Sequence, residues 1–335
     1  MRDRAGLTAT EGARLLGISQ AQLSNIGASR FGVSPERLRA MARNYRCSDI
    51  AYIQGLLDLA GERTPGWWET FREVLAAPLL DIAELEHHAT GLQSANTSHI
   101  PGLLQTTDHA REIFRQVVPE FSRSDIEHRV SHRLQRQAIL DRTASPPYQA
   151  VIHEAALRVP VGGTTVAKAQ LRHLLEQSER EHITIQVIPF AIGAYPGSGQ
   201  TILYVHGSAP RLDTVSLDQS HGPALVDAEA ELEAYRLLLA RMEAVALTPN
   251  SLPGGSVPGA GSPSPGGKGY RWNRAFLLLT AMRHSLAAPP EPFGTVPCSS
   301  DQRIFTTQGT RPRIELASVR EQMSTSPPSG PGSKD

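Results

Sequence analysis

The segment LTATEGARLLGISQAQLSNIGASRF, residues 7–31, contains two short helical patterns on either side of Gly17 and Ser19. Gly17 can end the first helix, because glycine adopts a left-handed cap without steric cost. Ser19 is a favourable N-cap for the second helix. Ala13 stands where the two helices would cross, and a larger side chain there would push them apart. The pattern predicts a helix-turn-helix whose apolar side is formed by Leu15, Leu16, Ile18, Leu23 and Ile26.

The second helix of this motif would carry a polar outer face. Short side chains that donate and accept hydrogen bonds read base edges in the major groove of DNA. Arginines contact the phosphates instead, so we expect Arg30, together with Arg2 and Arg4, to hold the DNA backbone. The remaining DNA contacts are expected from Ser19, Gln20, Ala21, Gln22, Ser24 and Asn25. An ordinary helical hairpin would show the same apolar pattern.

Four sequence blocks in this region resemble a known family. They are GLT at 6–8, ARLLGIS at 13–19, LSNI at 23–26 and RFGVSPERLRAMARNY at 30–45. In this order they resemble the lambda-repressor-like, or XRE-family, helix-turn-helix regulators over about the first sixty residues. The resemblance implies sequence-specific binding of double-stranded DNA. It also implies a homodimer, because one short recognition helix reads too few bases alone.

The region also departs from the family pattern. Ala9 stands where the family has a phosphate-contacting Gln, Gly12 where it has a buried Leu, and Gly27 where it has a Glu. A glycine inside a helix costs roughly 1 kcal/mol relative to alanine. The family's first helix would begin before Met1, so we expect either an upstream start or a shortened first helix.

Charge is distributed unevenly along a chain whose formal net charge is zero. Residues 1–48 contain eight arginines and three acidic residues, whereas residues 66–250 contain fifteen basic and twenty-two acidic residues. A basic N-terminal part is suited to nucleic-acid phosphates, and an acidic second part is not.

Cysteine usage and hydropathy exclude several classes of protein. Cys47 and Cys298 are the only cysteines among 335 residues, which excludes a disulfide framework and a cysteine-based zinc site. No signal peptide opens the chain, and no apolar run reaches the length of a membrane span. We therefore expect a cytoplasmic protein without membrane contact.

Two further helical patterns complete a predicted helix-turn-helix domain over residues 1–60, and residues 61–66 are expected to be a linker. The adjacent Trp67 and Trp68 then open a second domain, where an anchor in the core or at a domain interface is favoured over a ligand platform.

The second domain, residues 67–250, mixes helices with strands and is expected to hold the effector or partner-binding function. Helices are expected at 79–93, 107–117, 124–140, 165–179 and 227–247. Strands are expected at 148–152, 183–188, 201–205 and 212–217. The predicted fold class is mainly α, and α+β overall: an N-terminal helix-turn-helix domain, a helix-rich α+β domain and a disordered tail.

This second domain is similar to the uncharacterised C-terminal domain of one antitoxin-like subfamily of these regulators. The genes of that subfamily often stand beside one for a small protein, so the resemblance implies such a partner and no effector chemistry. The matching blocks, in order, are Trp67-Trp68, Leu85-Glu86, residues 100–105, 133–137, 153–157, 170–171 and 186–190.

The tail, residues 251–335, begins with a run of Gly, Pro and Ser that extends to Tyr270. Such a composition cannot bury a core, so we expect a low-complexity and mostly disordered segment. A private extension and a shifted reading frame explain it equally well.

No catalytic constellation emerges from the sequence. His153-Glu154 lacks the second histidine of a zinc protease motif, because Leu157 stands at that position. His128 and His132 share a helix face, but no third metal ligand is near in sequence, and a solvated face is favoured. We expect neither an enzyme, nor a cofactor, nor a metal site.

Arg129, Arg133 and Arg136 follow one another at spacings of four and three on a predicted helix. They form either a second nucleic-acid surface or a set of internal ion pairs. The domain is net acidic, so ion pairs with Glu86 or Glu154 are favoured.

The sequence as a whole predicts a transcriptional regulator that binds DNA through residues 20–26 and senses a ligand or a partner protein through its second domain. The first alternative is an antitoxin-like interaction protein whose altered helix-turn-helix no longer holds DNA. A third, more distant interpretation is a small-molecule sensor that acts without DNA.

Overall fold

The N-terminal helices follow a short turn of 3-10 helix, η1 (Asp3–Ala5). The computed structural model describes residues 1–28, 31–62, 64–197, 199–219 and 222–247. Each N-terminal helix begins at a side chain that accepts from a free backbone N–H, which is the usual N-cap. The helices are α1 (Ala9–Leu16), α2 (Gln20–Gly27), α3 (Pro35–Asn44) and α4 (Ile50–Gly61), capped by Thr8, Ser19, Ser34 and Asp49.

The turn between α1 and α2 has the predicted geometry. Gly17 ends α1 in the left-handed region, with φ of 65°. Ser19 caps α2, and its hydroxyl accepts from the backbone N–H of Gln22. The two predictions for these residues are confirmed.

A small core holds the N-terminal helices together. Its fully buried side chains are those of Ala13, Leu23, Leu38, Ala42 and Tyr45. The Tyr45 hydroxyl donates to the carbonyl oxygen of Gly12 at 3.1 Å. A Cβ added at Gly12 would lie 3.1–3.2 Å from side-chain atoms of Tyr45, Arg2 and Leu23, so a larger side chain requires these neighbours to shift.

The α+β domain begins at a second turn of 3-10 helix, η2 (Trp67–Phe71), and contains one mixed sheet of six strands in the order β3-β2-β1-β4-β5-β6. β1 runs parallel to β2, and β2 to β3, whereas β4, β5 and β6 continue the sheet with antiparallel pairing. The strands are β1 (Gly91–Asn96), β2 (Tyr148–His153), β3 (Ile183–Ile188), β4 (Ile202–His206), β5 (Thr214–Leu217) and β6 (Ala224–Val226).

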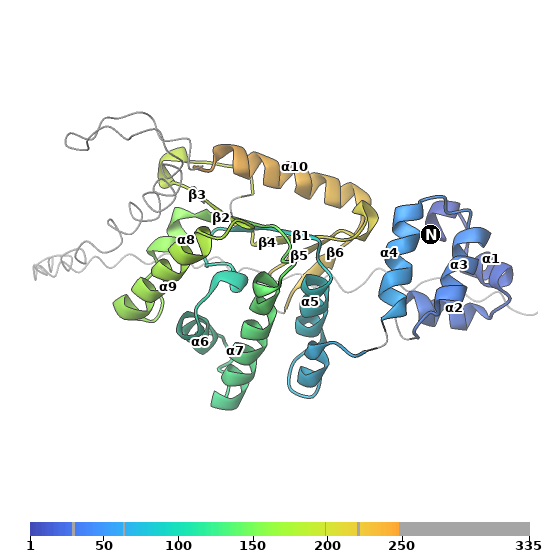
Figure 1. Cartoon of the computed structure of the whole chain (residues 1–335), viewed down its shortest axis with the longest axis horizontal. Helices are drawn as coiled ribbons and strands as arrows, with labels where there is room; N and C mark the ends of the chain where they lie inside the picture. The colour runs from blue at the N-terminus through green and yellow to red at the C-terminus, as the bar shows by residue number, and fades with distance from the viewer. Residues whose placement is uncertain (29–30, 63, 198, 220–221, 248–335) are drawn as a thin grey trace, which may run out of the picture. The chain divides into compact units, whose positions relative to one another are not determined.

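Helices cover both faces of this sheet (Figure 1). One face carries α5 (Ala77–His87), α6 (Thr107–Arg115), α7 (Arg123–Gln137) and α9 (Gly163–Ser178), and the other carries α10 (Glu229–Val245). Leu92, Ile152 and Leu174 belong to the core on the first face, and Tyr204, Leu239 and Met242 to the core under α10. The inner strand β2 is covered on both faces and mostly buried, which suits its apolar run, and the edge strand β3 is mostly buried as well.

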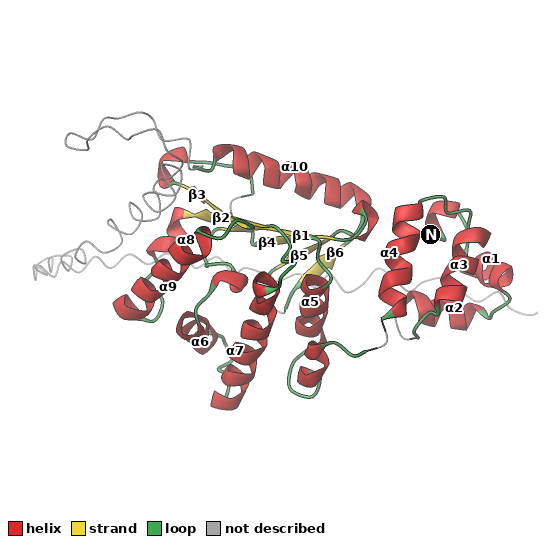
Figure 2. Ribbon diagram, in the orientation of Figure 1, coloured by secondary structure: helices red, strands yellow, loops and turns green. Residues whose placement is uncertain are grey.

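Several predicted boundaries are wrong. The helix expected over 79–93 ends at His87, and residues 91–96 form the central strand β1 (Figure 2). The sequence GLQSAN has no apolar run, because four of its six members are buried polar or very small residues. The long helix starts after Ser122 rather than Ser124. Besides β1, the helix α8 (Glu154–Arg158) and the strand β6 were also not predicted.

The expected low-complexity tail, residues 251–335, lies outside the described residues. Within the described residues, no helix combines the length and the apolar character that a transmembrane span requires. The described residues thus form a group of N-terminal helices followed by an α+β domain with a mixed six-stranded sheet.

Candidate functional site

The predicted DNA-contacting residues of 19–25 lie on and just before α2. Gln20, Ala21, Gln22 and Ser24 are exposed, and Asn25 is half-buried. Leu23 points the other way and is 4% exposed, so α2 packs by its apolar side and presents its polar side outward. Arg30 lies outside the described residues.

Reciprocal hydrogen bonds fix the start of this polar face. Ser19 donates its backbone N–H to Oε1 of Gln22 at 3.0 Å, and Gln22 donates its own N–H to the Ser19 hydroxyl at 3.1 Å. Thr10 of α1 donates its hydroxyl to Oε1 of Gln20 at 3.3 Å. Both glutamines are thus held by their carbonyl oxygens, and their amide NH2 groups remain as donors for a ligand.

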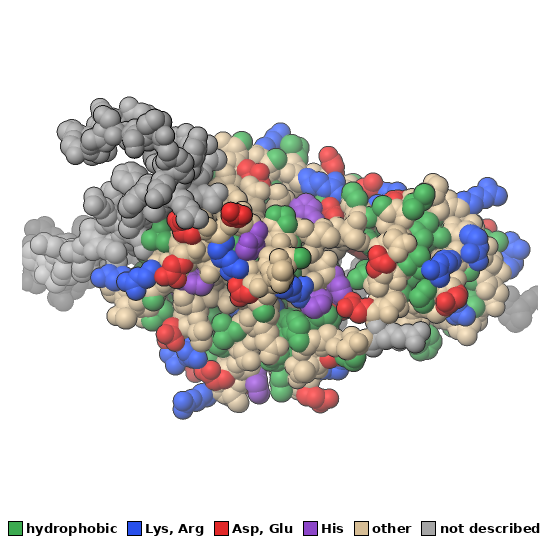
Figure 3. All heavy atoms as spheres, viewed as in Figure 1, with side chains coloured by type: hydrophobic (Ala, Val, Ile, Leu, Met, Phe, Trp, Pro, Cys, Tyr) green, Lys and Arg blue, Asp and Glu red, His purple; other side chains and the backbone are tan. Residues whose placement is uncertain are grey.

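Two of the arginines expected to contact phosphates have partners in this structure. Arg2 pairs with Asp3, and Arg4 pairs with Glu229 of α10. Other arginines of the N-terminal helices are exposed, and Figure 3 shows basic side chains gathered over these helices on the face in view. The exposed ones are Arg14, Arg37, Arg39, Arg43 and Arg46.

A second site lies inside the α+β domain, between the sheet and the helices α5 and α7. It is a polar cavity of about 240 Å³. Strands β1, β2, β4 and β5 supply the floor, helices α5 and α7 the opposite wall, and residues 99–105 a side. Its polar lining residues are Glu86, Ser94, Asn96, His99, Gln105, Arg133, Arg136, Tyr148, Thr201, Ser216 and Asp218.

A buried ion pair forms one wall of the polar cavity. Arg136 of α7 donates two hydrogen bonds to Glu86 of α5, at 2.6 and 2.7 Å. Glu86 is 1% exposed, and its negative charge raises the pKa of Arg136 against the effect of burial. The predicted ion pair between this arginine and Glu86 is confirmed, whereas Glu154 pairs with Arg158 instead.

Arg133 stands one turn before Arg136 and has no carboxylate partner among the described residues. It donates to the side-chain oxygen of Gln105 at 2.5 Å, and its guanidinium lies 4.5 Å from the ring centre of Phe114. Burial and the nearby Arg136 lower the pKa of Arg133 to about 10, so it remains charged at neutral pH.

Two histidines, His132 of α7 and His109 of α6, are buried rather than solvated. His132 is 3% exposed, and its ring lies 5.2 Å from that of Phe71 and 5.6 Å from that of Trp67. Burial, aided by Arg136, lowers its pKa to about 3. His109 is also 3% exposed, and burial lowers its pKa to about 4. The solvated face expected for His128 and His132 is therefore wrong for His132.

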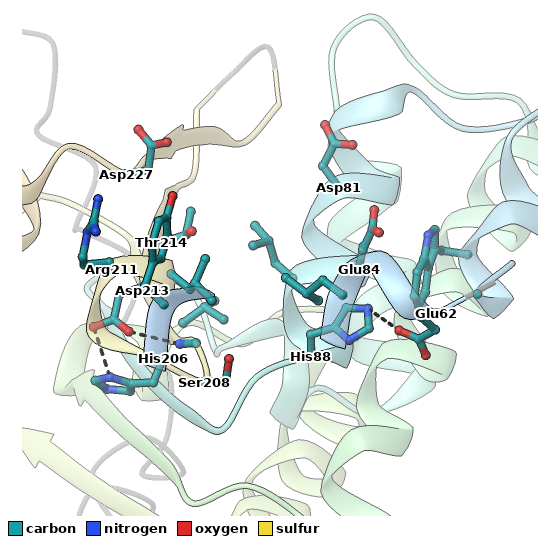
Figure 4. Close-up of a pocket in the computed structure, with 18 of the residues that line it drawn as sticks. Glu62, Asp81, Glu84, His88, His206, Ser208, Arg211, Asp213, Thr214 and Asp227 are labelled. Atoms are coloured by element: carbon teal, nitrogen blue, oxygen red, sulfur yellow. Dashed lines mark hydrogen bonds and ion pairs between the residues drawn. The ribbon is translucent and has the colours of Figure 1, made fainter. Parts of the chain in front are cut away.

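A larger pocket of about 770 Å³ is lined by η2, α5, the loop between β4 and β5, and residues of α4 (Figure 4). Carboxylates dominate its labelled side chains, and Asp213 accepts from the backbone N–H of Gly207 at 3.1 Å. On one side of the same pocket, Nε2 of His88 lies 3.4 Å from Oε2 of Glu62 (Figure 4). Glu62, His87 and His88 have ligand atoms within 4.8 Å of one another, the one such group of potential metal ligands among the described residues.

The polar cavity was missed by the sequence analysis because its residues come from separate elements. Only the arginine spacing in α7 pointed toward it. A further signal was available at Ser94 and Asn96, two polar residues that alternate on one face of β1 and are both buried.

Comparison with known proteins places the second domain in a family. Residues 79–251 match the model described as "Domain of unknown function (DUF5753)". No helix-turn-helix family model matches the N-terminal helices. Neither a curated protein nor a solved structure matches the chain. Since the match covers half of the sequence, the chain belongs to the DUF5753 family.

Proposed function

We propose that this protein binds double-stranded DNA in a sequence-specific manner through α2 and regulates transcription. The observation that carries the proposal is the polar outer face of α2, which Leu23 and the reciprocal hydrogen bonds of Ser19 and Gln22 hold in a fixed orientation. Amide side chains in such a position match the donor and acceptor patterns of base edges.

Electrostatics support the same function. Residues 1–48 carry an excess of five positive charges, and Arg14, Arg37 and Arg43 are exposed. Arginine contacts to phosphates fix the orientation of a protein on the duplex without reading sequence. A helix as short as α2 reads few bases, so the binding unit is proposed to be a homodimer.

The α+β domain is proposed to sense a ligand or a small partner protein and to shift the N-terminal helices between DNA-bound and free states. A second candidate function is an antitoxin-like interaction protein whose altered helix-turn-helix no longer holds DNA. Gly12 departs from the pattern of the regulators that the region resembles, and Tyr45 occupies the adjacent space.

The test is selection of bound sequences from a random DNA library by the purified full chain, at low and at moderate salt. Gln20→Ala and Asn25→Ala should each weaken binding to the selected sequence by about 1–3 kcal/mol. Arg30→Ala should weaken binding to all sequences alike. Gln54→Ala is the matched control, because Gln54 is an exposed amide on α4 that bonds to Asp58.

A chain that selects no sequence at low salt would overturn the proposal and leave the interaction protein as the better explanation. Equal losses of specific and non-specific binding in Gln20→Ala and Asn25→Ala would contradict the assignment of α2 as the reading helix.

A further inference from the structure

The polar cavity of the α+β domain has no role in DNA binding as proposed above, and its chemistry is that of a ligand site. Burying polar groups is unfavourable unless they are hydrogen-bonded, so interiors rarely keep spare polar atoms. Here several polar side chains converge on one space of about 240 Å³ beneath the sheet. Their charges and free atoms indicate what would fit.

The cavity contains one positive charge that is not neutralised by a direct partner. Arg136 is matched by the two oxygens of Glu86. Arg133, on the next turn, contacts only the neutral Gln105 and the face of Phe114, and its Nε atom is buried without a hydrogen-bond partner among the described residues. An arginine in this state favours a carboxylate or another anion.

The cavity also contains acceptors without a donor. Asn96, at the end of β1, is 6% exposed, and its Oδ1 has no hydrogen-bond partner among the described residues. Asp218 lines the cavity after β5 and is exposed, and no ion pair involves it within the described part of the chain. Asp218 is near enough to Arg133 to favour its charged form.

We propose that this cavity binds a small zwitterion of amino-acid size. Its carboxylate would accept from Arg133, and its ammonium group would donate to Asn96 Oδ1 and to Asp218. The volume of about 240 Å³ is sufficient for a ligand of this size.

The test is isothermal calorimetry on the full-length protein with the twenty common α-amino acids, added one at a time without DNA. At least one of them should bind. Each amino acid is compared with two analogues, one without the ammonium group and one without the carboxylate. For alanine these analogues are propionate and ethylamine. The corresponding desamino acid and amine of the best ligand should each bind about tenfold or more weakly, because each loses a charged hydrogen bond.

Three variants connect binding to these residues. Asp218→Asn keeps the shape of an exposed side chain and should weaken the best amino acid about tenfold or more. Arg133→Lys should weaken binding of the same amino acid to a similar extent. If the lysine variant does not fold, the result for Asp218→Asn alone tests the inference. Asp108→Asn is the matched control, because Asp108 is an exposed acid of α6 that does not line the cavity.

Failure of every amino acid to bind would overturn the inference, as would equal binding by the desamino acid. Binding that is unchanged in Asp218→Asn would place the ligand elsewhere and also contradict it. The measurement contains no DNA, so its outcome is independent of whether α2 reads a sequence.

Discussion

The N-terminal helices and the α+β domain bury very different interiors. The N-terminal helices pack a few small and medium side chains, and the only buried polar side-chain contact recorded within their described residues is the Tyr45 hydroxyl on Gly12. The α+β domain has two large apolar cores and buries a full ion pair and two histidines with them. The first region therefore depends on caps and close packing, and the second on polar groups that must stay paired or neutral.

The largest expected effect comes from breaking the buried ion pair of the α+β domain. Glu86→Ala leaves Arg136 charged and buried, which typically costs about 3–5 kcal/mol of stability. Urea unfolding followed by tryptophan fluorescence measures it, because Trp67 and Trp68 both lie in this domain. Arg111→Ala, at a more exposed pair with Glu127, is the control and should change little. Equal losses in the two variants would contradict the importance of the buried pair.

Acidification should separate the two regions next. His132 and His109 have folded pKa values of about 3 and about 4, below the ordinary 6.5, because burial disfavours the charged ring. Between pH 6.5 and these lower folded pKa values the unfolded chain binds more protons than the folded one. The stability that the neutral histidines contribute above pH 6.5 is therefore lost as the pH falls toward 3. At pH 5.5 each histidine should lower the free energy of unfolding by about 1.4 kcal/mol relative to neutral pH.

Residues 1–61 contain no histidine, so this loss is expected only in the α+β domain. Hydrogen exchange read by mass spectrometry at pH 7.5 and 5.5, corrected for the intrinsic exchange rates, resolves the two regions. If acidification from pH 7.5 to 5.5 increased the corrected exchange more in α1–α4 than in the strands of the sheet, this explanation would be contradicted.

Local signals predicted the N-terminal helices well, whereas the polar cavity depends on contacts that no local signal contains. Gly17 and Ser19 act on their own neighbours in sequence, so their roles could be predicted directly. Strand β1 could not, because GLQSAN is buried only when helices cover both faces of the sheet. Likewise, Asn96 and Arg133 are 37 positions apart and meet only through the packing of α7 on the sheet.

Close packing at Gly12 gives the third prediction. The resemblance to the XRE family suggests that Gly12→Leu restores a core side chain, but a Cβ there already crowds Tyr45, Arg2 and Leu23. Overpacking of this kind typically destabilises by about 1–3 kcal/mol. The check is hydrogen exchange of α1–α4 in the variant, and slower exchange than in the original protein would show that the site has room after all.

A matched control is available in the next helix. Gly27 has open space around it, so Gly27→Ala should stabilise α2 by a few tenths to about 1 kcal/mol, through helix propensity alone. Opposite signs for the two glycines would separate packing from propensity.

The smallest effect should come from a single atom. Tyr45→Phe removes the hydroxyl that donates to the carbonyl oxygen of Gly12 and keeps the ring that fills the core. The loss should be about 0.5–1.5 kcal/mol, because one neutral hydrogen bond is removed and no cavity is made. Tyr52→Phe on α4 is the control, since the recorded contact of Tyr52 with Arg211 is made by its ring face. Hydrogen exchange should accelerate in α1 and α3 for Tyr45→Phe and stay unchanged for Tyr52→Phe. If Tyr45→Phe leaves exchange in α1 unchanged, the N-terminal helices are held by apolar packing and caps alone, and the contrast with the α+β domain becomes sharper.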